Sequence, residues 1–197
     1  MDLLIGLVGF AFVTSVTPGP NNLMLLASGV NYGVRRTVPH MLGISLGHAL
    51  MVFLVGLGLA RVFEDVPWSR PALAVASILY MGWLALKIAT AAPPRCGRST
   101  GRPFTFLQAA AFQWVNPKAW VMALTAVTAY AAGTDWVSVL AVALVFAAVN
   151  LPSVGIWAVA GEKLRRFLDE PGTLRVFNIA MAVLLVASLV PLVWELV

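Results

Sequence analysis

The stretch Thr17-Pro18-Gly19-Pro20-Asn21-Asn22 interrupts an apolar segment, residues 3–34, that contains no Asp, Glu, Lys or Arg. A second stretch, Gln113-Trp114-Val115-Asn116-Pro117-Lys118-Ala119, interrupts another apolar segment in the second half of the chain. A proline inside a helix removes one backbone hydrogen bond and clashes with the carbonyl group four residues earlier. The sequence therefore predicts two long helices that are broken near their middles, with the carbonyl oxygens of Thr14, Val16 and Gln113 left without helical partners.

The composition of the chain places these broken helices in a membrane. Of the 197 residues, 60% are hydrophobic and only 11% are charged, and the mean hydropathy is +0.90. A soluble domain usually carries about 25% charged residues. Six spans of roughly 20 residues account for most of the chain and leave only short connections. We therefore expect one all-α membrane domain over residues 1–197.

Segments free of charged residues, together with one segment interrupted only by Lys118, predict six transmembrane helices. Each is near or above the length that crosses about 30 Å of hydrocarbon at roughly 1.5 Å per residue. The third reaches full length only if Lys87 extends its charged end toward the membrane surface. The predicted spans are 3–30, 38–60, 71–91, 104–130, 136–160 and 174–195.

Basic residues are concentrated in alternate connections. Ten Lys and Arg residues fall in the first, third and fifth connections, whereas the other connections and the tails hold two, Arg61 and Arg70. Connections rich in Lys and Arg stay in the cytoplasm, so both termini are expected outside. This placement accounts for the net charge of +5 without a nucleic-acid partner. Asp2 stands where a secretory signal would be basic, so the first span is expected to be retained.

A linker near the middle divides the chain into two halves of three spans each. Residues 92–103 contain three prolines, two glycines and three arginines, which leaves 1–91 and 104–197 as two repeats of opposite orientation in the membrane. Inverted repeats are a common plan of secondary transporters, with the substrate site near the bilayer midplane between broken helices. Cys96 is the single cysteine, so we expect no intramolecular disulfide, no metal site and no cofactor.

Each break has the composition of a new helix start. Asn116-Pro117 provides an N-cap followed by proline at the first helical position, and Thr17-Pro18 or Gly19-Pro20 can do the same. The N-terminal ends of two half-helices would then meet in the membrane, where their free N–H groups and dipoles favour an anion such as a carboxylate. Kinks that serve only packing are the alternative. The residues predicted to bind a substrate are Thr17, Pro18, Gly19, Pro20, Asn21, Asn22, Gln113, Asn116, Pro117, Lys118 and Asn150.

Lys118 is the one Asp, Glu, Lys or Arg that lies far from the end of a predicted span. It follows Phe104 by about 14 residues, roughly 21 Å along a helix and so near the midplane. A charge at that depth is costly and normally faces a cavity, where it can help to hold a carboxylate. The alternative is that Lys118 only pairs with carbonyl groups of a broken helix. Asn150, two residues before Pro152 in the fifth span, can supply an amide to the same cavity or join two helices.

Two histidines lie on the second span. His40 is expected at the cytoplasmic edge, with no special role. His48 lies deeper, one residue after the Gly43-x-x-x-Gly47 spacing that permits close helix contact. Because it is the one intramembrane group that can titrate near neutral pH, His48 is the candidate proton carrier. A histidine that is hydrogen-bonded within the bundle is an equally open interpretation.

Three motifs resemble the LysE/RhtB family of amino-acid exporters. They are Thr17-Pro18-Gly19-Pro20-Asn21, then Tyr80-Met81-Gly82-Trp83 followed by Leu84, Leu86 and Lys87, and finally Asn116-Pro117-Lys118-Ala119. The resemblance covers essentially the whole chain. It implies proton-driven efflux of amino acids across the bacterial inner membrane, either lysine and arginine or threonine, homoserine and related neutral compounds. Exporters of basic amino acids carry acidic groups in the membrane where this chain has His48, so a neutral substrate is expected.

The resulting hypothesis is a multi-pass secondary transporter, not an enzyme, that works by alternating access. Its expected partners are the amino acid, protons and the lipid bilayer, and a homodimer is compatible with its size. The substrate carboxylate would lie between Asn21 and Asn116 with Lys118 nearby. The ammonium would meet freed carbonyl groups and the side chains of Thr17, Gln113 or Asn150.

Two other functions remain as alternatives. A divalent-metal exporter of the same superfamily is the first, although the predicted spans lack the carboxylates or cysteines that metal ions need. A membrane hydrolase is the second, because Ser45 and His48 lie three residues apart on one helix. No oxyanion hole is evident beside them, so the pair is a weak indication of catalysis.

Overall fold

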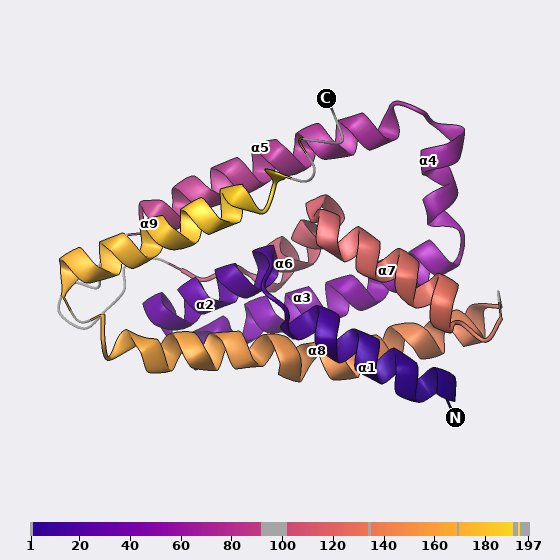
Figure 1. Ribbon diagram of the computed structural model, residues 1–197, viewed down its shortest axis with the longest axis horizontal. Helices are drawn as coiled ribbons and strands as arrows, with labels where there is room; N and C mark the ends of the chain where they lie inside the picture. The colour runs from indigo at the N-terminus through magenta and orange to yellow at the C-terminus, as the bar shows by residue number, and fades with distance from the viewer. Residues whose placement is uncertain (1, 92–101, 134, 169, 191–192, 194–197) are drawn as a thin grey trace.

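The computed structural model describes residues 2–91, 102–133, 135–168, 170–190 and 193. Within these ranges the chain is all-α and contains no strand, so the predicted fold class is confirmed at that level (Figure 1). Most of the predicted linker, including Cys96, lies outside the described residues. The helices are α1 (Asp2–Val16), α2 (Pro20–Tyr32), α3 (Val34–Gly56), η1 (Leu59–Arg61), α4 (Val62–Asp65), α5 (Ser69–Ala89), α6 (Phe106–Phe112), η2 (Gln113–Val115), α7 (Pro117–Tyr130), α8 (Trp136–Arg165) and α9 (Pro171–Ala187).

Three helices of the described chain, α3, α5 and α8, are long and apolar enough to cross a membrane. The pair α1 and α2 becomes a fourth candidate if it is one span, bent by 57° at its break. The apolar part of α9, Gly172–Ala187, is shorter, and η2 separates α6 and α7 into helices of 7 and 14 residues. The six predicted spans correspond in order to these elements, but three or four of them meet the length and composition of a span.

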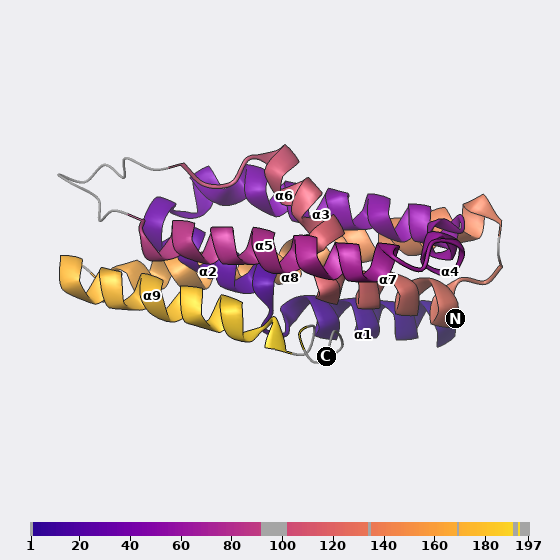
Figure 2. The same cartoon turned by 90° about the horizontal axis from the view of Figure 1, so that it is seen from above.

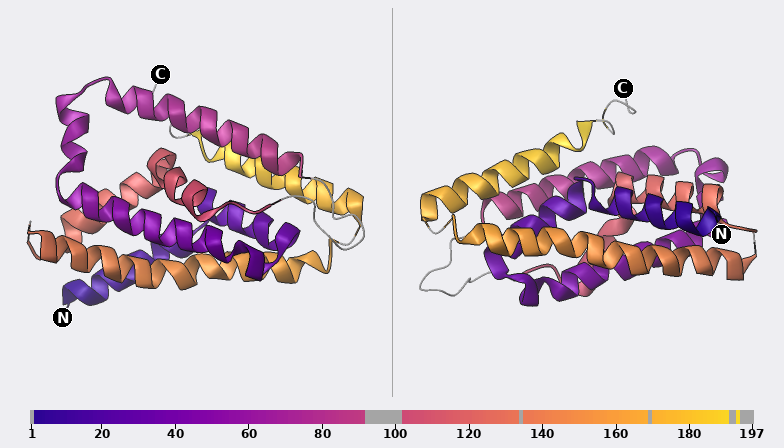
Figure 3. Two further views of the ribbon diagram at one scale, coloured as in Figure 1. Left: turned by 180° about the vertical axis from the view of Figure 1, so that it is seen from behind. Right: turned by 60° about the horizontal axis from the view of Figure 1, so that its bottom comes forward.

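The helix α8 runs the whole length of the bundle and packs against α1, α2 and α3 (Figure 1, Figure 3). It meets α2 backbone to backbone. Gly29 faces the carbonyl oxygen of Ala158, and Gly161 faces that of Leu26, each too closely to admit a Cβ atom. Close contact through small residues is a common way for membrane helices to pack. This crossing holds α2 in place after the first break.

The Gly43-x-x-x-Gly47 spacing forms the close helix contact that the sequence predicts. A Cβ on Gly47 would lie 2.6 Å from the Cα of Ala110, and a Cβ on Gly43 would collide with the carbonyl oxygen of Phe106. The two glycines therefore let α6 lie directly on α3. Because α6 ends at the second break, the same contact sets the position of that break.

The helices α5 and α9 lie side by side along one side of the bundle (Figure 1, Figure 2). A buried amide pair connects α9 to α2, since Asn31 Nδ2 donates to Asn178 Oδ1 at 3.0 Å. Sequence reasoning assigns no role to Asn178. A single amide in an apolar helix often joins two helices, and this one does so.

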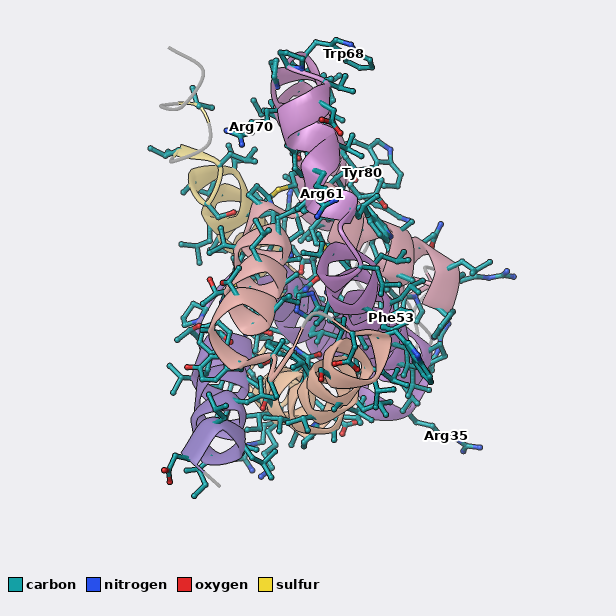
Figure 4. All side chains as sticks on the ribbon, turned by 90° about the vertical axis from the view of Figure 1, so that its right-hand side faces the viewer. Arg35, Phe53, Arg61, Trp68, Arg70 and Tyr80 are labelled. Carbon is teal, nitrogen blue, oxygen red and sulfur yellow. The ribbon has the colours of Figure 1, made fainter. Side chains whose placement is uncertain are left out.

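The connections gather at the two ends of the long axis. The junctions of α2 with α3 and of α8 with α9 lie at one end, and the N-terminus, α4 and the junction of α7 with α8 lie at the other (Figure 1). Figure 4 is seen from the second end and shows Arg61 and Arg70 near α4 and the start of α5. The described cations of the alternate connections lie at the first end, named here the basic end: Arg35, Arg36, Lys87, Arg102, Lys163, Arg165, Arg166 and Arg175.

Candidate functional site

The first break leaves residues 17–19 outside any helix, between the end of α1 and the start of α2. Side chains bond the carbonyl groups that the prolines deprive of partners. Trp157 of α8 donates its indole N–H to the Val16 oxygen at 3.1 Å. The Thr17 hydroxyl donates to the Thr14 oxygen at 3.0 Å. The bend is therefore stabilised by side chains in place of the missing helical hydrogen bonds.

Asn22 bonds the break from the α2 side. Its Nδ2 donates to the carbonyl oxygens of Ser15, at 2.8 Å, and Thr17, at 2.7 Å. Ser15 lies in the last turn of α1 and Thr17 in the break, so the Asn22 amide ties the start of α2 to the end of α1. Its Oδ1 is buried and has no hydrogen-bond partner.

The second break is shorter, and its backbone hydrogen bonds are made to neighbouring residues of the same segment. The turn η2 continues α6, and the Asn116 N–H donates to the Gln113 carbonyl oxygen at 3.3 Å before α7 begins at Pro117. The side-chain Nε2 of Gln113 donates to the Ala109 carbonyl oxygen at 2.9 Å. The backbone of this break thus finds its partners inside its own half of the chain.

Both half-helices start where the sequence predicts, but their caps differ from expectation. Asn116 is the N-cap of α7, yet its side chain makes no capping hydrogen bond, and its Oδ1 is buried without a partner. At the first break the start is Gly19-Pro20 and not Thr17-Pro18. Gly19 has no side chain and the Asn116 side chain does not bond the first turn, so the N-terminal ends of α2 and α7 keep N–H groups that can bind an anion.

Lys118 links the two breaks. Its Nζ donates to the carbonyl oxygen and hydroxyl of Thr17, each at 2.9 Å, and to the Pro18 oxygen at 3.3 Å. Gly19 gives the side chain room, because a Cβ there would lie 2.9 Å from Lys118 Cδ. In this conformation Lys118 makes the pairing with broken-helix carbonyls that the sequence left open as an alternative. These bonds hold the ammonium beside the N-terminal end of α2.

A reciprocal amide pair also joins the breaks. Asn21 Nδ2 donates to Gln113 Oε1 at 2.9 Å, and Gln113 Nε2 donates to Asn21 Oδ1 at 3.2 Å. Gln113 is completely buried, with 0% exposure. Each amide satisfies the other, so this pair positions the N-terminal end of α2 against the end of α6.

A cavity of about 20 Å³, named here the central cavity, lies between the breaks. A space of this size suits one water molecule and is smaller than an amino acid. Thr17 and Pro18 reach it only through their bonds to Lys118, and Pro20 and Pro117 begin helices without lining it. The predicted residues that line the central cavity are Gly19, Asn21, Asn22, His48, Gln113, Asn116, Lys118 and Asn150.

Several polar atoms around the central cavity lack partners. Among the described residues, the Oδ1 atoms of Asn22, Asn116 and Asn150 and both ring nitrogens of His48 are buried without a hydrogen bond. All four residues line the cavity, and the ring of His48 packs edge-on against Phe146 with 4.8 Å between centroids. Buried polar groups are almost always bonded, so a cluster of unpartnered ones indicates a binding site.

The charge of the central cavity is positive on balance. Lys118 contributes an ammonium, and the N-terminal ends of α2 and α7 each contribute the positive end of a helix dipole. No Asp or Glu is among the residues that line this cavity. It is therefore suited to a ligand with one negatively charged group.

Five further residues line the same space and are not among the predicted site residues: Thr14, Ser15, Ala119, Met122 and Val154. The Ser15 hydroxyl accepts a hydrogen bond from Asn150 Nδ2 at 2.8 Å. A hydroxyl close before a proline break is a weak signal, because serine in apolar helices often bonds its own backbone. Met122 and Val154 are ordinary apolar residues that carry no local signal.

The structure buries His40, which the sequence expects at the cytoplasmic edge. Its side chain is only 1% exposed, because the ring of Phe104 covers it with 5.3 Å between centroids. Both of its ring nitrogens lack hydrogen-bond partners. His40 lines a second cavity, of about 50 Å³, together with Tyr32 and Lys87 near the basic end. The covering residue comes from the other half of the chain, so no pattern on the second span predicts it.

The alternative functions gain no support from the described residues. Ser45 donates its hydroxyl to the Ala147 carbonyl oxygen at 2.9 Å, so it is directed to α8 and makes no hydrogen bond to His48. No group of three or more His, Cys, Asp or Glu side chains that could hold a metal ion occurs in the part of the chain that the structure describes.

Comparison with known proteins covers nearly the whole chain. The LysE type translocator family matches residues 12–193. The chain is 31% identical over 182 residues to a cysteine/O-acetylserine efflux protein of Escherichia coli (strain K12), with 90% of each chain covered. The same values hold for a cysteine/O-acetylserine efflux protein of Shigella sonnei (strain Ss046). No solved structure matches significantly. With both helix breaks inside the matched range, the chain belongs to the LysE type translocator family.

Proposed function

We propose that this translocator exports a small neutral amino acid or amino-acid derivative from the cytoplasm. The observation that carries the proposal is the central cavity, where one ammonium, two helix N-termini and three unpartnered amide oxygens surround a single space. These groups complement the two charged ends of an amino acid. A binding site that recognises both ends can accept several small side chains.

The substrate carboxylate binds at the N-terminal ends of α2 and α7, beside Lys118. Lys118 bonds neutral oxygens in this structure, whereas a carboxylate adds the attraction of an opposite charge to the hydrogen bond. A carboxylate therefore competes well for the ammonium that otherwise bonds the oxygens of Thr17 and Pro18. Once Lys118 turns to the substrate, the first break loses a contact with the second half of the chain. Substrate binding is in this way coupled to the contact between the halves.

The substrate ammonium binds the unpartnered Oδ1 atoms of Asn22, Asn116 and Asn150. A basic side chain would bring a second cation into a cavity that already holds Lys118 and whose lining includes no Asp or Glu. The relatives named above are efflux proteins for cysteine and O-acetylserine, both small and neutral like threonine and homoserine. We therefore propose a substrate of this class.

Transport requires the central cavity to enlarge. Its volume of about 20 Å³ is too small for an amino acid, so the site must widen before a substrate can bind. The two proline breaks give α1–α2 and α6–α7 points at which half-helices can change their angle. Rocking of the two inverted halves around a fixed midplane site opens it first to the cytoplasm and then to the outside. The basic end faces the cytoplasm, and both termini lie outside the bacterial inner membrane.

Proton coupling is assigned to His48. Its ring nitrogens border the central cavity without partners, so His48 can take up a proton when the substrate leaves. The variant His48→Gln keeps a similar size and polarity but does not titrate near neutral pH. We expect it to exchange substrate across the membrane normally and to lose acceleration by a pH gradient. Full gradient-driven export by His48→Gln would contradict this role.

Uptake into inside-out membrane vesicles tests the function directly, because the cytoplasmic face is then turned to the medium. Labelled cysteine, O-acetylserine, threonine, homoserine and lysine are compared with zinc and cadmium, with and without a pH gradient. We expect uptake of neutral amino acids only, increased by the gradient. The exposed Lys163 of α8 provides a control, and Lys163→Gln should transport as the unchanged protein does. Uptake of lysine or of a metal ion alone would overturn the proposal.

A further inference from the structure

The second cavity, named here the basic-end cavity, is lined by different residues from those of the central cavity. Its volume is about 50 Å³, and it is lined by α2, α3, the end of α5 and residues 102–104. Lys87 and Arg102 are exposed, whereas His40 and Phe104 are buried. The cavity thus has two cations at its outer edge and a buried imidazole inside.

The two cations are held without acidic partners. Lys87 Nζ lies 5.2 Å from the centroid of the Trp83 ring and 5.0 Å from that of Phe104, so cation–π contacts position it. Neither Lys87 nor Arg102 pairs with a carboxylate among the described residues. The sequence between Asp65 and Asp135 contains no Asp or Glu, so the linker cannot supply one. Both positive charges are available to an anion.

Two buried polar side chains, His40 and Asn31, interrupt the largely apolar lining of the basic-end cavity. Both nitrogens of the buried His40 have no hydrogen-bond partner. Asn31 also lines the cavity and is held in place by bonds from its Nδ2 to Ala27 and Asn178. A buried imidazole without partners in a cavity edged by cations indicates a site for a group that bonds both.

The two cavities lie along one helix. Asn22 lines the central cavity and Asn31 lines the basic-end cavity, nine residues apart or roughly 14 Å along α2. Leu25, which stands between these two positions on α2, belongs to an apolar core cluster with Met81 and Phe112. A substrate that comes from the basic end therefore meets the second cavity before it reaches the central one.

We propose that the basic-end cavity is a loading site, which binds the carboxylate of the amino acid before the substrate enters the central cavity. Lys87 and Arg102 bind the carboxylate oxygens, and the His40 imidazole supplies a further hydrogen bond from inside. The inference rests on the proposed function, because the ligand is the exported amino acid. An anionic lipid headgroup has similar chemistry, and the experiment must distinguish the two.

The test uses purified protein in vesicles of phosphatidylcholine, with labelled cysteine kept reduced as the probe. Half-saturation is measured from the basic end and from the opposite end for Lys87→Gln and Arg102→Gln. Loss of a charged hydrogen bond should raise the half-saturating concentration at the basic end about tenfold. Half-saturation at the opposite end and the maximal rate should not change, because the central cavity is intact. Lys163→Gln, which removes an exposed cation outside the cavity, should match the unchanged protein at both ends.

Three outcomes would overturn the loading site. Equal half-saturation in both variants and the unchanged protein would remove it and leave the proposed export function standing. A shift that occurs only when phosphatidylglycerol is added to the vesicles would assign the cavity to a lipid headgroup. Absence of any amino-acid transport by the unchanged protein would overturn the proposed function and the loading site together.

Discussion

The two helix breaks are alike in sequence but differ in how their backbone is satisfied. At the first break, side chains from the second half of the chain bond the carbonyl groups, with Trp157 on Val16 and Lys118 on Thr17 and Pro18. At the second break, η2 closes its hydrogen bonds within its own half. The first break therefore depends on the second half of the chain, and Lys118 is part of that support.

This difference shows that two similar motifs can take complementary roles. Lys118 is the cation among the described residues that line the central cavity; it lies on the second half, and its acceptors lie on the first. In the function proposed above, a ligand that competes for Lys118 would change the contact between the halves. Changes at the Lys118 contact should therefore have the largest effects, and changes remote from both breaks the smallest.

Replacing Lys118 should reduce the difference between the breaks, leaving the Trp157 bond to Val16 as the support from the second half of the chain. Lys118→Ala removes three hydrogen bonds to the first break and the cation for the carboxylate. We expect transport to fall by about tenfold to a hundredfold, because a charged hydrogen bond is worth roughly 1.5–3 kcal/mol. Uptake into inside-out vesicles measures it, and the amount of protein in the membrane should stay normal. Lys163→Ala is the control, and ordinary transport by Lys118→Ala would contradict the assigned role.

In the amide pair Asn21 and Gln113, a side chain from each break both donates and accepts a hydrogen bond. Asn21→Leu or Gln113→Leu removes the partner of a buried amide oxygen on the other residue, so each should lower the free energy of unfolding by about 1–3 kcal/mol. The double variant should be more stable than the sum predicts, by about 1 kcal/mol. Unfolding in detergent measures the four proteins. Strict additivity would mean that the pair does not couple the breaks.

A substitution at Gly19 tests whether the close packing of Lys118 against the first break matters for transport. The backbone at Gly19 is extended, with φ 177°, so alanine is allowed there, but its Cβ would lie 2.9 Å from Lys118 Cδ and 3.2 Å from Nζ. We expect Gly19→Ala to lower transport by less than about tenfold, or roughly 1.4 kcal/mol, because the lysine can shift. Gly9→Ala is the matched control, since no atom lies within 4 Å of its Cβ. Equal transport by both variants would show that the fit is unimportant.

The smallest effect is expected at Asp135, the N-cap of α8, outside the membrane. Unlike the starts of α2 and α7, this helix start is capped by a side chain, as Asp135 Oδ1 accepts from the N–H groups of Val137, at 3.0 Å, and Ser138, at 3.1 Å. Hydrogen bonds from the Ser138 hydroxyl and backbone lower the pKa of Asp135 below its ordinary value. Asp135→Ala should lower the melting temperature by a few degrees at most and leave transport unchanged.

The pH dependence of this small effect has a definite sign. Because the folded pKa is lowered, the ionised cap stabilises the protein fully above the ordinary aspartate pKa of about 3.9, and this benefit is lost as the pH falls through the lowered folded pKa. The melting temperatures of the unchanged protein and Asp135→Ala should therefore differ at pH 7 and converge in strong acid. A difference that persists at low pH would show that the charge is not its source.

Local rules predicted much of this architecture. The prolines located both breaks, the charge-free segments located the long helices, and the Gly43-x-x-x-Gly47 spacing predicted the contact with α6. Eight predicted residues line the central cavity because they stand directly at the breaks or on helices that pass them. Each of these predictions depends on bonds or steric limits within a few residues of the chain.

Contacts between distant residues were not predicted. Phe104 buries His40, Asn150 bonds Ser15, and Gly161 of α8 admits the backbone of α2. The partners in these contacts are more than sixty residues apart, and no pattern near either residue identifies the other. They are decided by how helices pack, which depends on all their side chains together.

The amino-acid sequence is enough to place the chain in a membrane, to locate its breaks and to identify Lys118 as the unusual charge, because hydropathy, proline chemistry and charge burial act on short segments. The tertiary structure alone decides what Lys118 bonds, which amides are left without partners and that a second, cationic cavity lies at the basic end. These properties belong to the space between helices, and that space forms only when distant segments come together.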